Sequence, residues 1–212
     1  MVKTYGADTM RVYEMFMGPF DQQIAWSTQS MIGARRFIER VWKLQERVVI
    51  GGIQVTDSSS LNRIIHKTIK KVTDDILGLR FNTAISTLMI AVNELEKSSG
   101  ITRSQFEMFL KLLAPFAPHV TDELWTSLGN KRSIHMSSWP EFDSKLAEDS
   151  RVTIAVQING KTRGSFESAT DALESDVRAT ALALPEVIKW TQGKEIKKVI
   201  VIKGKIVSIV TN

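Results

Sequence analysis

The strongest hydrophobic pattern in the chain lies in residues 80–125. Apolar residues recur three and four positions apart in residues 81–95, and the same spacing returns in residues 106–113. This spacing is typical of two α-helices that each bury one face. Thr102 and Gln105, just before the second run, have the spacing of a capping box. The pattern therefore predicts a helical hairpin at the centre of the chain.

Helical spacing continues on both sides of this hairpin. Residues 118–125 form a short apolar run that begins with a proline, which suits the first turn of a helix. Near the N-terminus, residues 10–17 form another run, and Asp8 is placed to cap its start. Two longer runs occupy residues 30–49 and 61–77. Together these segments predict an antiparallel bundle of helices joined by short loops.

The period changes after residue 150. In residues 151–158 apolar residues alternate with polar or small ones, which is typical of a half-buried strand. Asn159 and Gly160 follow, and this pair is a strong signal for a β-hairpin. The rest of the chain predicts a compact α+β unit of order β-β-α-β-β. Its predicted elements are residues 151–158, 161–168, 171–193, 196–202 and 205–212.

Length and composition limit the class of protein. A chain of 212 residues with 43% hydrophobic and 24% charged residues suits one or two globular domains. It contains neither a run of about 18 apolar residues, which a transmembrane helix requires, nor a secretory signal. We therefore expect a cytoplasmic protein without a membrane partner.

The sequence offers no arrangement of residues for catalysis or metal binding. Cysteine is absent, and His66, His119 and His135 are too far apart for metal-ligand spacing. No serine lies in a GxSxG motif, and no glycine-rich phosphate loop occurs. We expect no catalytic residue, no metal site and no cofactor in this chain, and we interpret it as a binding module.

Positive charge is concentrated near the C-terminus. The formal net charge is +5, and residues 151–212 hold 10 basic and 6 acidic side chains, whereas residues 1–150 hold 18 and 17. Such an excess suits an anionic partner such as nucleic acid. Lysines at strand edges also protect a sheet from aggregation, so the charge alone leaves both interpretations open.

The helix predicted over residues 30–49 carries a second group of basic residues. They lie mostly opposite its apolar stripe: Arg35, Arg36, Arg40, Lys43 and Arg47. A basic helix face can follow a phosphate backbone. A charged face is more often only solvated, so RNA contact here is one of two interpretations.

Several stretches resemble one family of enzymes. FNTAISTLMIAVNEL (81–95), LAPFAPHVTDELW (113–125) and SIHMSSWPEFD (133–143) are similar to the helical anticodon-binding domain of class I aminoacyl-tRNA synthetases for aliphatic amino acids. YGADTMRVYEMFMGPFDQQIAWS (5–27) and VQINGKTRG (156–164) agree with the same family in the same order. Within this group the chain most resembles the leucyl-tRNA synthetases of bacterial type.

The resemblance implies a domain organisation. The fold would be mainly α, with residues 1–28 as a connector from a catalytic domain. Residues 29–148 would form the antiparallel helical bundle of the anticodon-binding type. Residues 149–212 would form a small C-terminal α+β domain that binds tRNA.

The resemblance also implies a function. The chain would be the C-terminal tRNA-binding portion of the synthetase and would position tRNA(Leu) for ATP-dependent leucylation. The HIGH and KMSKS motifs of the catalytic domain do not occur, so the chain alone should be inactive, and ATP and Mg²⁺ would belong to the full-length enzyme. The expected partners are tRNA(Leu) and the catalytic and editing domains of the same polypeptide, in a monomer.

Residues for RNA contact follow from the same resemblance. The NGKxR element of the family is matched by Asn159, Gly160, Lys161 and Arg163, although these four residues also make a good turn. Their cationic side chains would neutralise phosphates. We further expect several lysines of the last two strands to converge. The predicted RNA-binding set is Asn159, Gly160, Lys161, Arg163, Lys194, Lys197, Lys198, Lys203, Lys205, Arg36, Arg40 and Lys43.

Three alternatives stay open at this point. The chain could correspond to the same region of an isoleucyl-, valyl- or methionyl-tRNA synthetase, although VQINGKTRG favours leucine. It could be a free-standing RNA-binding module, or a structural helical protein without an RNA partner. The last interpretation predicts either no RNA binding or binding that does not depend on salt.

Overall fold

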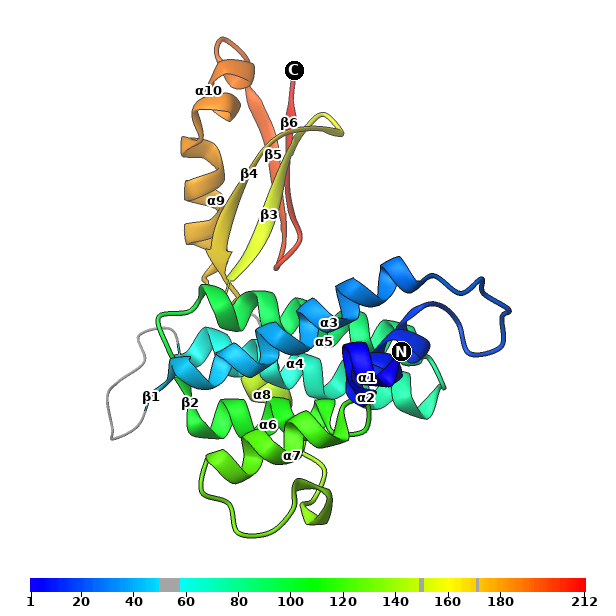
Figure 1. Ribbon diagram of the computed structural model, residues 1–212. Helices are drawn as coiled ribbons and strands as arrows, with labels where there is room; N and C mark the ends of the chain where they lie inside the picture. Colours follow the sequence, from blue (N-terminus) through cyan, green and yellow to red (C-terminus); the bar gives the residue numbers. More distant parts are fainter. Residues whose placement is uncertain (50–57, 149–150, 171) are drawn as a thin grey trace. The chain divides into compact units, whose positions relative to one another are not determined.

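The computed structural model describes residues 1–49, 58–148, 151–170 and 172–212. The chain divides into two compact units, Met1–Ala147 and Glu148–Asn212. Figure 1 shows the first unit as mainly helical and the second as a small sheet with helices. The predicted fold class, a helical bundle followed by a β-β-α-β-β unit, is confirmed.

Helices make up most of the first unit. Two 3-10 turns, Leu44–Arg47 and Ile134–Met136, and a parallel pairing of β1 (Val48–Val49) with β2 (Ile101–Thr102) complete it. Among its described residues the α-helices are α1 (Val2–Tyr5), α2 (Ala7–Phe16), α3 (Thr28–Lys43), α4 (Ser58–Leu77), α5 (Phe81–Lys97), α6 (Arg103–Leu113), α7 (Pro118–Ser127) and α8 (Ser144–Ala147). α4 packs against α5 and α6, and α2 packs against α3 and α5, so segments distant in sequence share one core.

The core of the helical unit consists of the helix faces that the hydrophobic spacing predicts. Ile85 and Leu88 of α5 and Phe106 and Phe109 of α6 are fully buried. Each such side chain contributes about 1.5–3 kcal/mol through removal of apolar surface from water. α2 adds Val12 to the same core, so the N-terminal segment is part of this unit.

The capping box predicted at the start of α6 is confirmed. The Thr102 side chain accepts a hydrogen bond from the Gln105 backbone N–H (3.2 Å), and the Gln105 side chain accepts one from the Thr102 backbone N–H (2.9 Å). The same Gln105 side chain donates to the Asn62 side chain in α4 at 2.7 Å. The cap therefore also ties α6 to α4.

The prediction that Asp8 caps its own helix is wrong. α2 begins at Ala7, so Asp8 lies inside the helix, whereas a capping residue lies just before the first helical position. Its carboxylate instead accepts hydrogen bonds from the backbone N–H groups of His119 (2.9 Å) and Val120 (2.8 Å), at the start of α7. Asp8 therefore caps α7. Ala117, at the N-cap position of α7, makes no side-chain cap hydrogen bond.

The second unit is a four-stranded sheet with helices on one face (Figure 1). The strands are β3 (Arg151–Ile158), β4 (Lys161–Ala169), β5 (Ile196–Ile202) and β6 (Ile206–Thr211), and the helices are α9 (Glu174–Ala183) and α10 (Pro185–Thr191). The spatial order is β4-β3-β6-β5, with β3 parallel to β6 and both outer pairs antiparallel. The chain enters and leaves through the two central strands.

The core of this unit lies between the sheet and the two helices. Val156 of β3 and Val207 of β6 are fully buried there, together with Val187 of α10. Ile200 and Ile202 of β5 point the other way and are 41% and 51% exposed. One face of the sheet is therefore packed, and the other is open at β5.

Candidate nucleic-acid interface

The predicted hairpin turn joins β3 to β4. Asn159 and Gly160 both have positive φ, 48° and 80°, as the favoured two-residue hairpin turns require. The Asn159 side chain accepts a hydrogen bond from the Thr211 backbone N–H (3.0 Å) and donates one to the Thr211 hydroxyl (3.1 Å). The amide of Asn159 therefore fastens the turn to the end of β6, and Asn159 acts here as a structural residue.

Five of the predicted cations lie at the same end of the sheet as this turn. Ile196 at the start of β5 pairs with Thr211, the residue that Asn159 binds. Lys161 and Arg163 follow the turn on β4, and Lys194, Lys197 and Lys198 precede or begin β5. None of these five forms an ion pair with another described residue. Their charges are therefore available to an anionic partner.

The structure does not bring Lys203 and Lys205 to this group. They lie in the turn between β5 and β6, where the Lys205 N–H binds the Ile202 carbonyl at 3.0 Å. Ile206 next to that turn pairs with Ala155, at the middle of β3, whereas Ile209 lies beside Ile158 at the hairpin end. The expectation that the lysines of the last two strands converge is therefore wrong, because the strands carry Lys198 and Lys203 to opposite ends.

Sequence reasoning missed one residue beside this surface, Trp190. The Arg163 guanidinium lies over the Trp190 ring, 3.6 Å from its centroid. Trp190 belongs to α10 and is 41% exposed. The only signal in the sequence was the presence of a single tryptophan in a lysine-rich segment, which does not reveal its neighbour.

The predicted basic residues of α3 are in a different electrostatic situation. Arg40 donates hydrogen bonds to both Glu96 oxygens (2.9 and 2.6 Å) and to Asn93 Oδ1 (2.6 Å) of α5. Hydrogen bonding to Glu96 raises the pKa of Arg40, and the same contact lowers the pKa of Glu96. Arg36 and Lys43 are exposed and form no ion pair with described residues. Arg40 thus joins two helices, while its predicted companions stay available.

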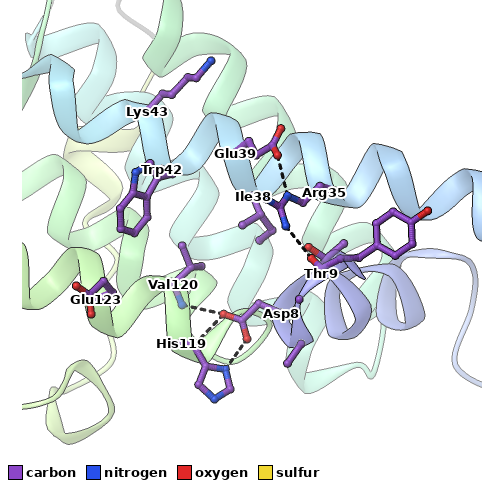
Figure 2. Close-up of a pocket in the computed structure, with 13 residues that line it drawn as sticks. Asp8, Thr9, Arg35, Ile38, Glu39, Trp42, Lys43, His119, Val120 and Glu123 are labelled. Carbon is purple, nitrogen blue, oxygen red and sulfur yellow. Dashed lines mark hydrogen bonds and ion pairs between the residues drawn. The ribbon is translucent and has the colours of Figure 1, made fainter. Parts of the chain in front are cut away.

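A cavity of about 840 Å³ lies between α2, α3 and α7 (Figure 2). Trp42, Ile38 and Val120 form much of its apolar lining. Arg35 at its edge donates to Glu39 (2.7 Å) and to the Tyr5 carbonyl (3.0 Å). Arg35 is already paired, and Lys43 is a lining cation without an ion pair among the described residues, so the cavity offers less free positive charge than the five cations at the sheet end of the second unit.

Asp8 and His119 at this cavity have part of the geometry of an acid–base pair. Asp8 Oδ1 lies 2.8 Å from His119 Nδ1 and 3.1 Å from an Arg11 guanidinium nitrogen. A catalytic pair of this type also needs a nucleophile within hydrogen-bond reach of the other ring nitrogen. No serine or threonine in the described part of the chain contacts that nitrogen. The pair therefore has a visible role only in joining α2 to α7.

The residues that the structure describes offer neither a metal site nor a membrane-spanning helix. No group of three or more histidine, aspartate or glutamate side chains there could hold a metal ion. None of the helices in those ranges combines the length and the apolar character that crossing a bilayer requires.

Comparison with known proteins places the chain in a family. Residues 59–177 match the model of the anticodon-binding domain of tRNA ligases. The chain is 48% identical over 210 residues to a leucine-tRNA ligase of Chloroherpeton thalassium, covering 97% of this chain and 26% of that protein. The chain thus spans about a quarter of the length of this relative.

A solved structure agrees with the sequence match. The chain is similar to the LeuRS of a ternary LeuRS-tRNA-LeuAMS complex from Agrobacterium radiobacter K84, with a TM-score of 0.81 and 28% sequence identity. This likeness covers 100% of this chain and 30% of that one. The chain therefore belongs to the anticodon-binding domain family of tRNA ligases, and its likeness to leucine-tRNA ligase runs through both of its units.

Proposed function

We propose that this chain is the tRNA-binding portion of a leucine-tRNA ligase and positions tRNA(Leu) for ATP-dependent leucylation. The observation that carries the proposal is the set of unpaired cations at the end of the sheet that holds the β3–β4 turn, in a chain similar to leucine-tRNA ligase along 97% of its length. The solved relative is a complex with tRNA, which supports the same partner.

The physical basis of the binding is neutralisation of phosphates. A lysine or arginine that contacts a phosphate releases condensed counterions, so each contact adds affinity and makes that affinity fall with salt. Lys161, Arg163, Lys194, Lys197 and Lys198 need to break no internal ion pair with a described residue to do so. We therefore assign most of the phosphate contacts of this chain to the second unit.

The contribution to leucylation would be positional. Holding the tRNA body in one orientation raises the effective concentration of its acceptor end at a reaction site. The chain contains neither HIGH nor KMSKS and no glycine-rich phosphate loop, so its residues do not fit ATP with Mg²⁺. We assign both, together with catalysis and editing, to other domains of a full-length enzyme, and the expected cytoplasmic location stays a prediction.

The test measures binding of this chain to a tRNA(Leu) transcript and to a tRNA(Ile) transcript across a salt series. The Lys161→Ala/Arg163→Ala variant is compared with Lys97→Ala/Arg103→Ala, which removes the same charge from residues already paired with Glu94 and Glu107. We expect the first variant to reduce the slope of log K against log salt by about 1 for each lost phosphate contact. The second should leave the slope nearly unchanged.

Two results would contradict the proposal. Equal slopes for the two double variants would show that the hairpin cations do not contact phosphates. Binding of wild-type chain that is absent, or insensitive to salt, would remove RNA as the partner of the chain. A leucylation assay of the chain alone should detect no charged tRNA, and any activity would refute the assignment of catalysis to other domains.

A further inference from the structure

Aromatic residues are rare in the second unit, and the two present have different environments. Residues 148–212 contain only Phe166 and Trp190 as aromatic side chains. Phe166 on β4 packs against the core between sheet and helices. Trp190 near the end of α10 is 41% exposed, although burial of a tryptophan removes more apolar surface from water than that of other residues. Packing of the core therefore does not account for its position.

The exposed ring is covered by a cation rather than by apolar groups. Arg163 lies over it at 3.6 Å from the ring centroid and has no carboxylate partner among the described residues. The two groups come together because α10 runs close to β4. Gly164 follows Arg163 on β4, and a Cβ atom built on Gly164 would lie 3.6 Å from the side chain of Leu184, the residue just before α10. The pairing of β3 with β4 also shifts by one residue beside Arg163, between Val156 and Gln157. Both features concern the backbone around Arg163, whose guanidinium lies above the indole.

The surroundings of this stacked pair favour an anionic, aromatic ligand. Two exposed lysines lie close to this pair in the sequence: Lys161, two positions before Arg163 on β4, and Lys189, one position before Trp190 on α10. Neither forms an ion pair with a described residue. Nucleobases stack on aromatic side chains and on arginine planes, while nearby cations hold the phosphates. An exposed aromatic ring near unpaired cations can therefore stack on a base and also hold its phosphate. Single-stranded or looped RNA supplies both an unstacked base and a phosphate.

We infer that Trp190 and Arg163 form a stacking platform for an unpaired nucleobase of the bound RNA. This inference rests on the proposed function and adds the mode of binding. Arg163 keeps the indole in place and carries positive charge to the backbone of the same nucleotide, while the exposed part of the Trp190 ring contacts the base. Phosphate contacts alone would use Arg163 in the same way but would make no use of the ring.

The test separates stacking from charge through two measured quantities. Trp190→Ala should weaken binding of the tRNA(Leu) transcript about 5- to 100-fold, the effect of losing one base stack, and leave the salt slope unchanged. Trp190→Phe should recover most of the affinity. Arg163→Lys keeps the charge but not the flat guanidinium, so it should weaken binding and preserve the slope. Trp26→Ala is the control, since Trp26 is 46% exposed and lies in the other unit.

Fluorescence gives a readout that a structural role of Trp190 would not change. The chain contains five tryptophans, so the part of the RNA-induced quenching that disappears in Trp190→Phe belongs to Trp190. We expect this part to be substantial and to saturate with the binding curve. Thermal unfolding of each variant shows whether it is folded, and Trp190→Phe and Arg163→Lys keep the test valid if Trp190→Ala does not fold.

The outcomes distinguish this inference from the proposed function. If folded Trp190→Ala binds like wild type while Lys161→Ala/Arg163→Ala lowers the salt slope, the platform is refuted and tRNA binding stands. Quenching that is the same in wild type and Trp190→Phe would also refute the platform. If the wild-type chain shows no salt-dependent binding of RNA, both ideas are wrong.

Discussion

The two units of this chain use positive charge in different ways. In the helical unit Arg40 is paired with Glu96, Arg103 with Glu107, and both Lys71 and Arg80 with Asp75. In the second unit the basic residues at the hairpin end have no such partner among the described residues: Lys161, Arg163, Lys194, Lys197 and Lys198. A paired guanidinium must give up its carboxylate before it can bind phosphate, whereas an unpaired cation gives up only water. Part of the positive charge of the first unit is therefore held in ion pairs within or between helices, although Arg36 and Lys43 form no ion pair with described residues. All five cations at the hairpin end of the second unit lack an ion pair with a described residue, as the proposed function requires.

The largest effect is expected where a carboxylate of the helical unit is fully buried. Asp75 is 0% exposed, and Asp75→Asn should lower the free energy of unfolding at neutral pH by about 1–3 kcal/mol, because Lys71 and Arg80 lose an ionised acceptor. Both cations are about half exposed, so water replaces part of the loss. Urea unfolding measures the effect. Asp74→Asn is the matched control, and an equal loss in both variants would contradict the role of Asp75.

The same residue predicts how stability depends on pH. Burial acts to raise the pKa of Asp75, but hydrogen bonds from Lys71, Thr83 and Arg80 outweigh it and lower the pKa. Because the folded value lies below the unfolded value of about 3.9, the contribution is complete above that value and is lost as pH falls through the folded pKa. Stability should therefore fall less steeply with acid below about pH 4 in Asp75→Asn. Parallel acid profiles of variant and wild type would contradict this.

A smaller effect is expected at the cap that joins α2 to α7. Asp8→Ala removes the acceptor for the His119 and Val120 backbone N–H groups and should cost about 1 kcal/mol of unfolding free energy, within the usual range of 0.5–2. Asp8→Asn keeps one acceptor oxygen and should lose less. Equilibrium unfolding of both variants checks the order. If Asp8→Ala is as stable as wild type, the cap contributes nothing to the joining of these helices.

The smallest change in stability is expected for Glu96→Gln, which also tests whether ion pairing keeps Arg40 from RNA. Glu96→Gln releases Arg40 from its ion pair, and since both side chains are partly exposed the cost should be only about 0.2–1 kcal/mol. The released guanidinium should then contact RNA and steepen the salt slope of tRNA binding by up to about 1. Glu107→Gln, which removes the ion pair of Arg103 on α6, is the control. An unchanged slope in Glu96→Gln would show that pairing is not what withholds Arg40 from RNA.

Whether a contact could be predicted from the sequence depends on how far apart its two residues lie along the chain. The capping box of α6 could be predicted because Thr102 and Gln105 are three residues apart. The role of Asp8 could not, because its partners His119 and Val120 are 111 and 112 residues away. Arg40 was predicted as an RNA contact from its place on a basic helix face, and its partner Glu96 lies 56 residues away.

The RNA-binding set shows the same division within one small unit. The turn at Asn159 and Gly160 follows from two adjacent residues that tolerate positive φ. The separation of Lys203 from Lys198 follows from the length of β5, since Lys198 lies near its start and Lys203 just past its end, whereas the contact of Arg163 with Trp190 depends on where α10 crosses β4. The crossing of a helix over a strand leaves no periodic trace in the sequence, so Trp190 was missed.

The sequence by itself determined the type and order of the elements, the basic excess of the last 62 residues and the likeness to one family. Hydrophobic period and turn residues express backbone geometry over a few neighbouring positions, so a single sequence carries them. Only the tertiary structure decided which cations are paired and which aromatic ring is exposed. Those properties depend on side chains that approach within a few ångströms from segments far apart in the chain, and folding alone brings them together.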